Sequence, residues 1–152
     1  MDRIKTAVAL GSNVGDRRAH LDFAASRLQS FLSSLKMSGY YETEPVGVPG
    51  IQPTFLNAVA VGETTLSARA VLNQLLAIER ERGRERPYPN APRTLDLDLV
   101  LFGDAVIQEP DLIVPHPRFR ERRFVVEPLA EVAPAMRDPV SGQTVAELLR
   151  SM

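Results

Sequence analysis

The chain contains no cysteine, which excludes disulfide bridges and thiolate metal sites. It also lacks an apolar run long enough to cross a membrane, and its first residues do not resemble a signal peptide. Neither sign of charge dominates, because 18 basic residues face 19 acidic ones and the formal net charge is −1. A nearly neutral chain creates no global field that attracts nucleic acid or a membrane surface. We therefore expect a cytoplasmic protein that binds neither.

The residues that are present have the proportions of one ordinary domain. Hydrophobic residues make up 44% of the chain and charged residues 24%, which is typical of globular proteins. A chain of 152 residues can bury a single core. We find no internal repeat, low-complexity tract or linker, and we predict one domain over residues 1–152.

The most informative stretch is residues 95–102, where apolar and acidic residues alternate with the period of a strand. Two aspartates two residues apart on one face repel each other unless a cation offsets their charge. Mg²⁺ prefers such oxygen ligands and keeps positions for water and substrate oxygens. We interpret the pair as a magnesium platform for a phosphate-bearing substrate, although an isolated Asp-x-Asp is more often a solvated strand face. One face would hold Leu95, Leu97, Leu99 and Leu101, and the other Asp96, Asp98, Val100 and Phe102.

Apolar patterns predict the remaining core elements. We expect a strand over 4–10 that ends in a tight turn at Gly11-Ser12-Asn13, and then a helix after Asp16 whose apolar face extends to Leu35. Strands over 36–43 and 55–61 follow, and then a helix from the N-cap Ser67 to about Arg82. With the aspartate strand, this is the ferredoxin-like βαββαβ core of an α+β fold, an antiparallel sheet with both helices on one face. Asp96 and Asp98 would then project from the uncovered face.

The remainder of the chain is predicted to extend this core. We expect a short strand at 105–107, an apolar segment over 124–129 and a last helix opened by a capping box at Thr144 and Glu147. The proline-rich loop over 44–53 is either a shaped binding loop or a plain connector. Asn57 is either a satisfied buried amide or a group that binds a ligand. The arginines of 84–93 and those near His116 favour contact with phosphate over a merely solvated surface.

Several segments together resemble one family, the 6-hydroxymethyl-7,8-dihydropterin pyrophosphokinases of folate biosynthesis. They occur in the right order and span nearly the whole chain, and the segment from Pro92 to Asp98 is the most specific. The segments are Ala9-Leu10-Gly11-Ser12-Asn13 with Gly15-Asp16, Tyr41-Glu42-Thr43-Glu44-Pro45, Phe55-Leu56-Asn57-Ala58-Val59, Ile78-Glu79 with Gly83-Arg84, Pro92-Arg93-Thr94-Leu95-Asp96-Leu97-Asp98, Val114-Pro115-His116-Pro117-Arg118, Arg122 with Phe124, and Pro128-Leu129.

This resemblance implies transfer of the terminal diphosphate of ATP to the hydroxymethyl oxygen of the reduced pterin, with release of AMP and with two Mg²⁺ ions. By position, Asp96 and Asp98 would hold both metal ions, and Arg84 and Arg93 would assist the transfer. Phe55 and Phe124 would sandwich the pterin ring. The implied pterin site is Thr43, Val46, Phe55, Asn57 and Phe124, and the implied nucleotide site is Glu79, Arg84, Arg86, Arg93, His116 and Arg122. No nucleic acid, membrane or obligate protein partner is implied.

The chain departs from the family pattern at one place, where Asn90-Ala91 precede Pro92-Arg93 instead of an aromatic residue and a glycine. The loop is also about one residue shorter, so Arg93 is assigned more securely than Arg84 or Arg86. Tyr88 is a candidate for the replaced aromatic side chain.

Two other classes of function compete with this enzyme. An RNA-binding module can share the same order of elements. Such a module requires a basic-aromatic strand motif and excess positive charge, and this chain has neither. A non-catalytic pterin or nucleotide sensor would bind the ligands without forming AMP.

Overall fold

The computed structural model describes residues 2–44, 54–83 and 94–152. The strands are β1 (Ile4–Ser12), β2 (Ser33–Met37), β3 (Tyr41–Thr43), β4 (Phe55–Thr64), β5 (Asp96–Phe102), β6 (Ile107–Glu109) and β7 (Leu112–Val114). The α-helices are α1 (Arg17–Leu28), α2 (Ala68–Glu81), α3 (Arg123–Val132) and α4 (Val145–Arg150), and a short 3₁₀ helix spans Phe119–Glu121. None of the helices in this described part of the chain has the length and apolar character that a membrane crossing needs.

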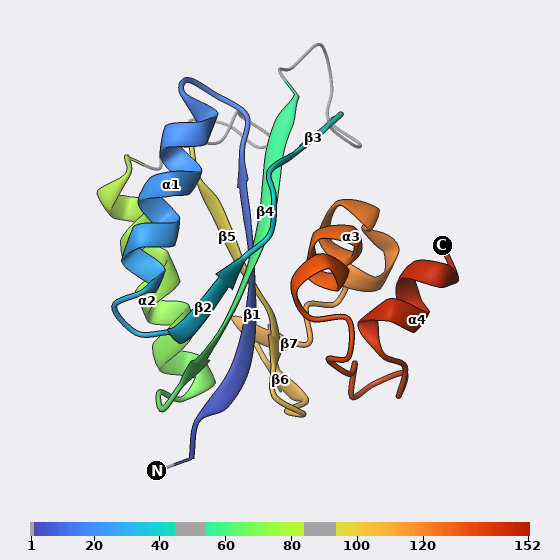
Figure 1. Ribbon diagram of the computed structural model, residues 1–152. Helices are drawn as coiled ribbons and strands as arrows, with labels where there is room; N and C mark the ends of the chain where they lie inside the picture. Colours follow the sequence, from blue (N-terminus) through green and yellow to red (C-terminus); the bar gives the residue numbers. More distant parts are fainter. Residues whose placement is uncertain (1, 45–53, 84–93) are drawn as a thin grey trace.

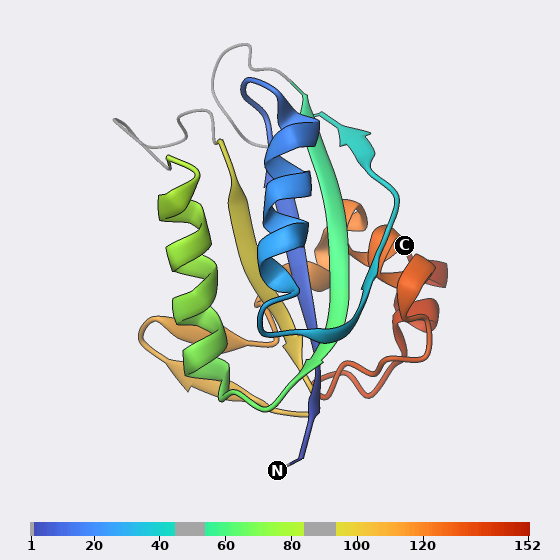
Figure 2. The same cartoon turned by 60° about the vertical axis from the view of Figure 1, so that its left-hand side comes forward.

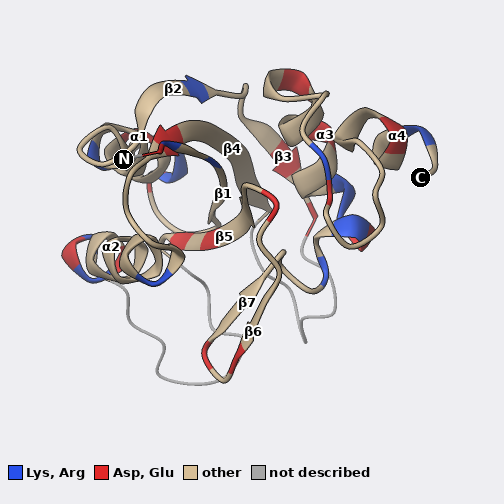
Figure 3. Cartoon of the chain, turned by 90° about the horizontal axis from the view of Figure 1, so that it is seen from below, with Lys and Arg blue, Asp and Glu red and all other residues tan. Residues whose placement is uncertain are grey.

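One antiparallel sheet forms the centre of the molecule. Its strand order is β2-β4-β1-β5, and β3 pairs with the other end of β4. Helices α1 and α2 lie on one face of the sheet, with α3 and α4 on the other (Figures 1 and 2). The hairpin β6-β7 lies below, beside the end of β5 (Figure 1). Both signs of charge occur on α2 and on α4, as the near-neutral composition leads one to expect (Figure 3).

Each face of the sheet buries its own hydrophobic cluster. Val8, Leu10 and Leu97 pack toward α1 and α2, where Leu21 and Leu75 meet them. The opposite cluster joins the sheet to α3 and α4, and it contains Ala7, Val59, Val61, Val126, Leu129 and Leu148. The expectation of an uncovered face is therefore wrong over part of that face. The apolar side of α3 needs a layer to pack on, and the nearest one is this half of the sheet.

A β-bulge in β5 reverses the faces predicted for its last two residues. The alternation holds from Asp96 to Leu99, but the register with β1 then shifts, so that Leu99 pairs with Val8 while Leu101 pairs with the adjacent Ala7. Val100 is the extra residue, and it and Leu101 both join the cluster under α3. Phe102 instead joins the cluster under α1 and α2. Leu101 and Phe102 thus lie on the faces opposite to those predicted, because a bulge adds one residue and reverses the later alternation.

The first helix is shorter than its apolar pattern indicates. It ends at Leu28, where the Ser30 hydroxyl donates to the Arg27 carbonyl over 2.7 Å, and Leu35 lies in β2. A serine side chain that bonds to a nearby carbonyl competes with helix continuation. Pairing of Ser33 with β4 then fixes the strand. The predicted strand over 36–43 is accordingly two strands, β2 and β3.

The tight turn predicted at Gly11-Ser12-Asn13 comes later in the chain. Gly11 and Ser12 still pair with β4, opposite Asn57 and Leu56, and the turn follows at Gly15, whose φ is +69°. The predicted helix starts are confirmed, since Asp16 and Ser67 accept hydrogen bonds from their own helices. The capping box of α4 is complete, with Thr144 and Glu147 each bonded to the other's backbone.

Candidate active site

The two aspartates of β5 lie two residues apart, in separate rows of paired residues across the sheet. Asp96 pairs with Gly11 of β1, which pairs in turn with Asn57 of β4. Asp98 lies two residues further along, opposite Ala9. Residues that pair directly across an antiparallel sheet point to the same face. Both carboxylates therefore share a face with the Asn57 amide, and both are partly buried.

Asn57 is almost buried, with 7% of its surface exposed. Its Nδ2 donates to the Thr43 hydroxyl over 2.5 Å, which ties β4 to β3 at the site. A Cβ atom built on Gly11 would lie 3.1 Å from the Asn57 Oδ1 and 3.7 Å from a ring carbon of Phe55. The amide and the ring therefore lie close to Gly11, and a larger residue there would crowd the amide. The structure places Thr43, Phe55 and Asn57 close together, and their role in binding the pterin stays a prediction.

Arg17 holds together the strands that carry these residues, a role that no pattern in the sequence indicates. Its guanidinium donates to the carbonyl and hydroxyl oxygens of Thr54 over 2.9 Å each, and to the Glu42 carboxylate over 2.8 Å. Hydrogen bonds from Arg17 and then Thr54 lower the pKa of the exposed Glu42 carboxyl. Arg17 thus links the start of α1 to β3 and to the residue before β4.

His116 reaches the acid pair from the C-terminal part of the chain. Its backbone N–H donates to the carbonyl oxygen of the bulge residue Val100 over 2.9 Å. Its Nδ1 accepts a hydrogen bond from the Arg118 N–H over 3.2 Å, which leaves Nε2 as the protonated nitrogen of a neutral ring. Burial, and then the Arg122 guanidinium, lower the pKa of His116, while Asp96 raises it less. A bulge beside a functional site commonly re-aims a side chain in this way.

Arg122 and Phe124 stand together where the 3₁₀ helix meets α3. The Arg122 guanidinium carbon lies 5.7 Å from the centre of the Phe124 ring, within the range of a cation–π contact. Phe124 is half-buried against the cluster between the sheet and α3. Both residues therefore approach the sheet from the side on which Asp96 and Asn57 project.

Glu79 lies on α2 and is 2% exposed. Its Oε2 accepts a hydrogen bond from the Leu97 N–H over 2.7 Å, between the two aspartates. The nucleotide contact that the resemblance implies for Glu79 stays a prediction. Four further predicted site residues, Val46, Arg84, Arg86 and Arg93, lie outside the described residues, as does Tyr88.

The donor set fits Mg²⁺ in chemistry. Within residues 2–44, 54–83 and 94–152, no group of three or more His, Cys, Asp or Glu residues is arranged to hold a metal ion. A pair of carboxylates is nevertheless what Mg²⁺ uses when substrate phosphates and water complete its coordination. The small residues Gly11 and Ala9 pair with Asp96 and Asp98, so neither carboxylate has a bulky neighbour on β1.

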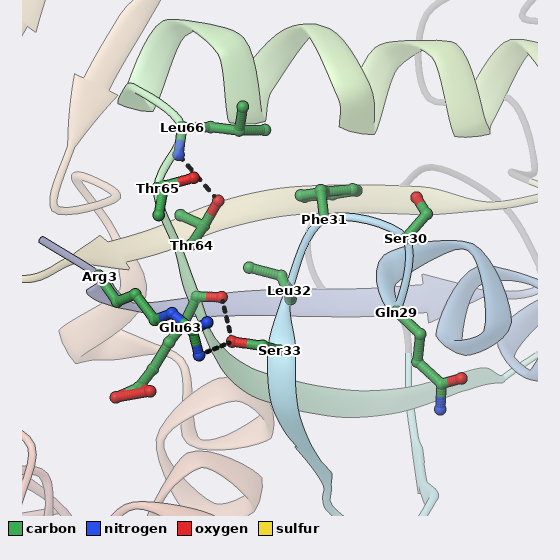
Figure 4. Close-up of a pocket in the computed structure, with 10 residues that line it drawn as sticks. All are labelled: Arg3, Gln29, Ser30, Phe31, Leu32, Ser33, Glu63, Thr64, Thr65 and Leu66. Atoms are coloured by element: carbon green, nitrogen blue, oxygen red, sulfur yellow. Dashed lines mark hydrogen bonds between the residues drawn. The ribbon is translucent and has the colours of Figure 1, made fainter. Parts of the chain in front are cut away.

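A separate hollow of about 330 Å³ lies at the other end of the sheet (Figure 4). Arg3, Ser33, Glu63 and Thr64 contribute to its wall, and the Arg3 guanidinium donates to the Ser33 hydroxyl over 3.3 Å. Thr64 pairs with Ile4 at the start of β1, whereas Asp96 pairs with Gly11. Seven strand residues separate the two places by roughly 24 Å. The hollow contains none of the predicted site residues.

Comparison with known proteins identifies relatives that match almost the whole chain. Residues 7–134 match the family described as 7,8-dihydro-6-hydroxymethylpterin-pyrophosphokinase (HPPK). The 2-amino-4-hydroxy-6-hydroxymethyldihydropteridine pyrophosphokinase of Pseudomonas aeruginosa is 41% identical over 144 residues, which are 93% of this chain and 88% of the relative. The enzyme of the same name from Bacillus subtilis is 41% identical over 146 residues, 94% of this chain and 87% of the relative.

A solved structure shares the fold. The crystal structure of wild-type HPPK-DHPS from Plasmodium falciparum superposes with a TM-score of 0.78 at 14% sequence identity. The match covers 99% of this chain but 45% of that longer one. By the extent of its sequence match, this chain belongs to the 7,8-dihydro-6-hydroxymethylpterin-pyrophosphokinase family.

Proposed function

We propose that the protein transfers the diphosphate group of ATP to the hydroxymethyl oxygen of 6-hydroxymethyl-7,8-dihydropterin in folate biosynthesis. The pterin oxygen attacks the β-phosphorus, and the bond from that phosphorus to the oxygen of the α-phosphate breaks. AMP leaves with that oxygen, and the pterin hydroxyl loses its proton. The observation that carries the proposal is the single row of Asn57, Gly11 and Asp96 across three strands.

The pterin half of the site would be built on β3 and β4. An amide such as that of Asn57 offers both a donor and an acceptor to the polar edge of the ring. Phe55 and Phe124 offer flat apolar faces, and a few polar groups then give selectivity. The support for this half is that Asn57 and Phe55 lie close to Gly11 and that Thr43 is hydrogen-bonded to Asn57. Val46 completes the proposed set.

The nucleotide half would lie toward the C-terminal segment. A neutral His116 would donate from Nε2 to a phosphate oxygen, since Nδ1 already accepts from the backbone. Guanidinium groups would oppose the charge that develops on the transferred group. We propose Arg84, Arg86, Arg93, His116 and Arg122 as nucleotide-binding residues, with Arg84 and Arg93 assisting the transfer. The nucleotide contact that the resemblance implies for Glu79 competes with a positioning role through the backbone of β5.

Asp96 and Asp98 would hold two Mg²⁺ ions. When bound, such ions would stabilise the charge on the transferred group and would lower the pKa of the pterin hydroxyl. Phosphoryl-group transfer asks the protein mainly for positioning and charge stabilisation. The support is the shared face of the two carboxylates beside Gly11 and Ala9.

The finer fold assignment belongs to the same proposal. We infer a ferredoxin-like core with a C-terminal extension, in one domain over residues 1–152. Its support is the antiparallel order β2-β4-β1-β5 with α1 and α2 on one face. The cytoplasmic location stays a prediction.

Product analysis tests the proposed function directly. The protein is incubated with ATP, Mg²⁺ and 6-hydroxymethyl-7,8-dihydropterin, and the nucleotides are separated. We expect one AMP for each pterin diphosphate formed. Formation of ADP would show γ-phosphoryl transfer, and binding of both substrates without any product would indicate a sensor; either result would overturn the proposal.

A further inference from the structure

The carboxylate of Glu79 occupies a place where an apolar side chain would be expected. The buried residues of α2 are Ala68, Val71, Leu75, Ile78 and Glu79. Glu79 follows Leu75 by four residues, so it lies on the stripe of α2 that faces the core. Burial of a charge is costly unless hydrogen bonds satisfy it. A carboxylate at this position therefore needs a hydrogen-bond donor nearby, to which an apolar side chain could not bond.

The backbone of β5 supplies such a partner. The Leu97 N–H donates to Glu79 Oε2 over 2.7 Å, a length typical of a charge-assisted hydrogen bond. In the order β2-β4-β1-β5, β5 is the last strand, and no strand among the residues that the structure describes pairs with its outer edge. Successive N–H groups of a strand point to alternate sides. Glu79 thus takes the role that a neighbouring strand would have for this N–H.

The site of this hydrogen bond matters for the two acids. Asp96 is the first residue of β5, and Leu97 is the single residue between it and Asp98. Among the described strands, the start of β5 pairs with β1 on one side only, so strand pairing constrains its backbone less than in a central strand. The hydrogen bond that the Leu97 N–H donates to Glu79 fixes the peptide plane between Asp96 and Leu97, and hence the directions in which the two aspartate side chains leave the backbone.

We propose that Glu79 is a positioning residue that sets the geometry of Asp96 and Asp98 through the backbone of β5. The role of the two acids as Mg²⁺ ligands rests on the proposed function, but the hydrogen bond itself does not. This inference differs from a direct contact between Glu79 and the nucleotide. In the positioning role, Glu79 affects how tightly the acid pair binds Mg²⁺, and it acts without touching any ligand.

The test compares three variants of the full chain. Glu79→Gln keeps an oxygen that can accept from Leu97, and Glu79→Leu keeps the bulk but removes the acceptor. Glu81→Gln is the matched control, since Glu81 lies on the same helix with its side chain 46% exposed and paired to Arg27. Thermal denaturation shows which variants are folded, and if Glu79→Leu is not, Glu79→Gln alone carries the test through its smaller effects.

The first readout is hydrogen exchange at the Leu97 amide, measured by NMR without any ligand. We expect exchange at least about tenfold faster in Glu79→Leu, a smaller increase in Glu79→Gln, and no change in Glu81→Gln. Unchanged exchange in both Glu79 variants would overturn the inference. Because this readout needs no activity, it stays informative even if the proposed reaction fails.

The second readout is Mg²⁺ affinity, followed by the NMR shifts of the Asp96 and Asp98 amides. The titration is made with saturating α,β-methylene-ATP, whose methylene bridge resists the proposed cleavage. We expect several-fold weaker Mg²⁺ binding in Glu79→Leu, partial recovery in Glu79→Gln, and unchanged affinity for the analogue at saturating Mg²⁺. Loss of affinity for the analogue in both variants, with Mg²⁺ affinity unchanged, would assign Glu79 to direct nucleotide contact and overturn the positioning role.

Discussion

The side chain of Asn57 donates from Nδ2 to the hydroxyl oxygen of Thr43 over 2.5 Å. This hydrogen bond joins β3 and β4 and turns the Asn57 Oδ1 toward Gly11. An amide that is held in this way presents one fixed pattern of donor and acceptor. A ligand that binds over Gly11 thus meets an oriented amide instead of one that rotates.

Loss of the Thr43 hydroxyl should weaken pterin binding through Asn57. In Thr43→Val, Asn57 keeps its place but loses a hydrogen bond worth about 1 kcal/mol, so we expect the KM for the pterin to rise roughly fivefold. Asn57→Ala should raise KM further, and the double variant should be no worse than Asn57→Ala alone. Steady-state kinetics of the cycle tests this coupling. Independent, multiplicative effects would show that Thr43 does not act through Asn57.

A methyl group at Gly11 should displace the amide without unfolding the sheet. In Gly11→Ala, the new Cβ would stand 3.1 Å from the Asn57 Oδ1, so the amide must shift by a few tenths of an ångström and strain its hydrogen bond to Thr43. We expect a several-fold rise in the pterin KM, with stability changed by less than about 1 kcal/mol. Gly39→Ala is the control, since its Cβ would make an ordinary 3.7 Å contact with Glu131. Equal kinetics in the two variants would contradict the crowding.

Neutralising either aspartate of β5 should abolish AMP formation. Asp96→Asn and Asp98→Asn keep the size of each side chain but halve the charge available to Mg²⁺. Because loss of a mere outer-shell partner costs about 10–100-fold, we expect a loss of at least about 100-fold in kcat/KM. Circular dichroism should show an unchanged fold. The same change at Asp104, an exposed turn residue just beyond β5, should leave activity intact.

Asp138 should make stability depend on pH in the acid range. Its side chain is fully buried and accepts two hydrogen bonds from Arg120, at 2.5 and 2.8 Å. Burial raises the pKa of Asp138, but the hydrogen bonds from Arg120, Ser141 and Val140 outweigh it and bring the value to about 2. The unfolded chain therefore takes up a proton on Asp138 before the folded protein does. The ion pair stabilises fully above the unfolded pKa of 3.8 and loses its effect as pH falls toward 2.

Asp138→Asn measures that contribution. The shift of the pKa corresponds to about 2 kcal/mol, and the uncompensated Arg120 adds to the loss, so we expect the variant to be about 3 kcal/mol less stable at pH 7. Urea denaturation should give a constant difference from wild type between pH 7 and about 4.5, and a smaller one at pH 3. A difference that is the same at pH 3 and pH 7 would contradict the low pKa.

The strands and helices were predictable where a periodic pattern coincides with a local signal. Ser67 and the apolar stripe after it define α2, and the alternation around Leu97 defines β5 and the face of its acids. The bulge was not predictable, because Val100 looks like any strand residue and only the pairing with Ala7 and Val8 makes it extra. Pairing with β4 likewise overrode the helical pattern that ran on to Leu35.

The candidate site was predictable mainly through the family resemblance. No periodicity places His116 near Asp96. The two are brought close because the turn that contains His116 is hydrogen-bonded to the Val100 carbonyl. Arg17 gave no signal, because its partners Glu42 and Thr54 are distant in sequence and are brought close by the sheet. The resemblance supplied a list of site residues, whereas the part Glu79 plays emerged from its contact with a backbone amide.

The surplus residue in β5 has a consequence for how the strand could vary in length. With Val100 deleted, Leu99 and Leu101 would become adjacent, as their partners Val8 and Ala7 already are. Leu101 and Phe102 would keep their present sides, so the sheet would tolerate the shortening. The turn that contains His116 would not tolerate it, because the Val100 carbonyl oxygen that accepts a hydrogen bond from the His116 N–H would be lost. The carbonyl of Val100, the extra residue of β5, thus holds the backbone of His116 in place.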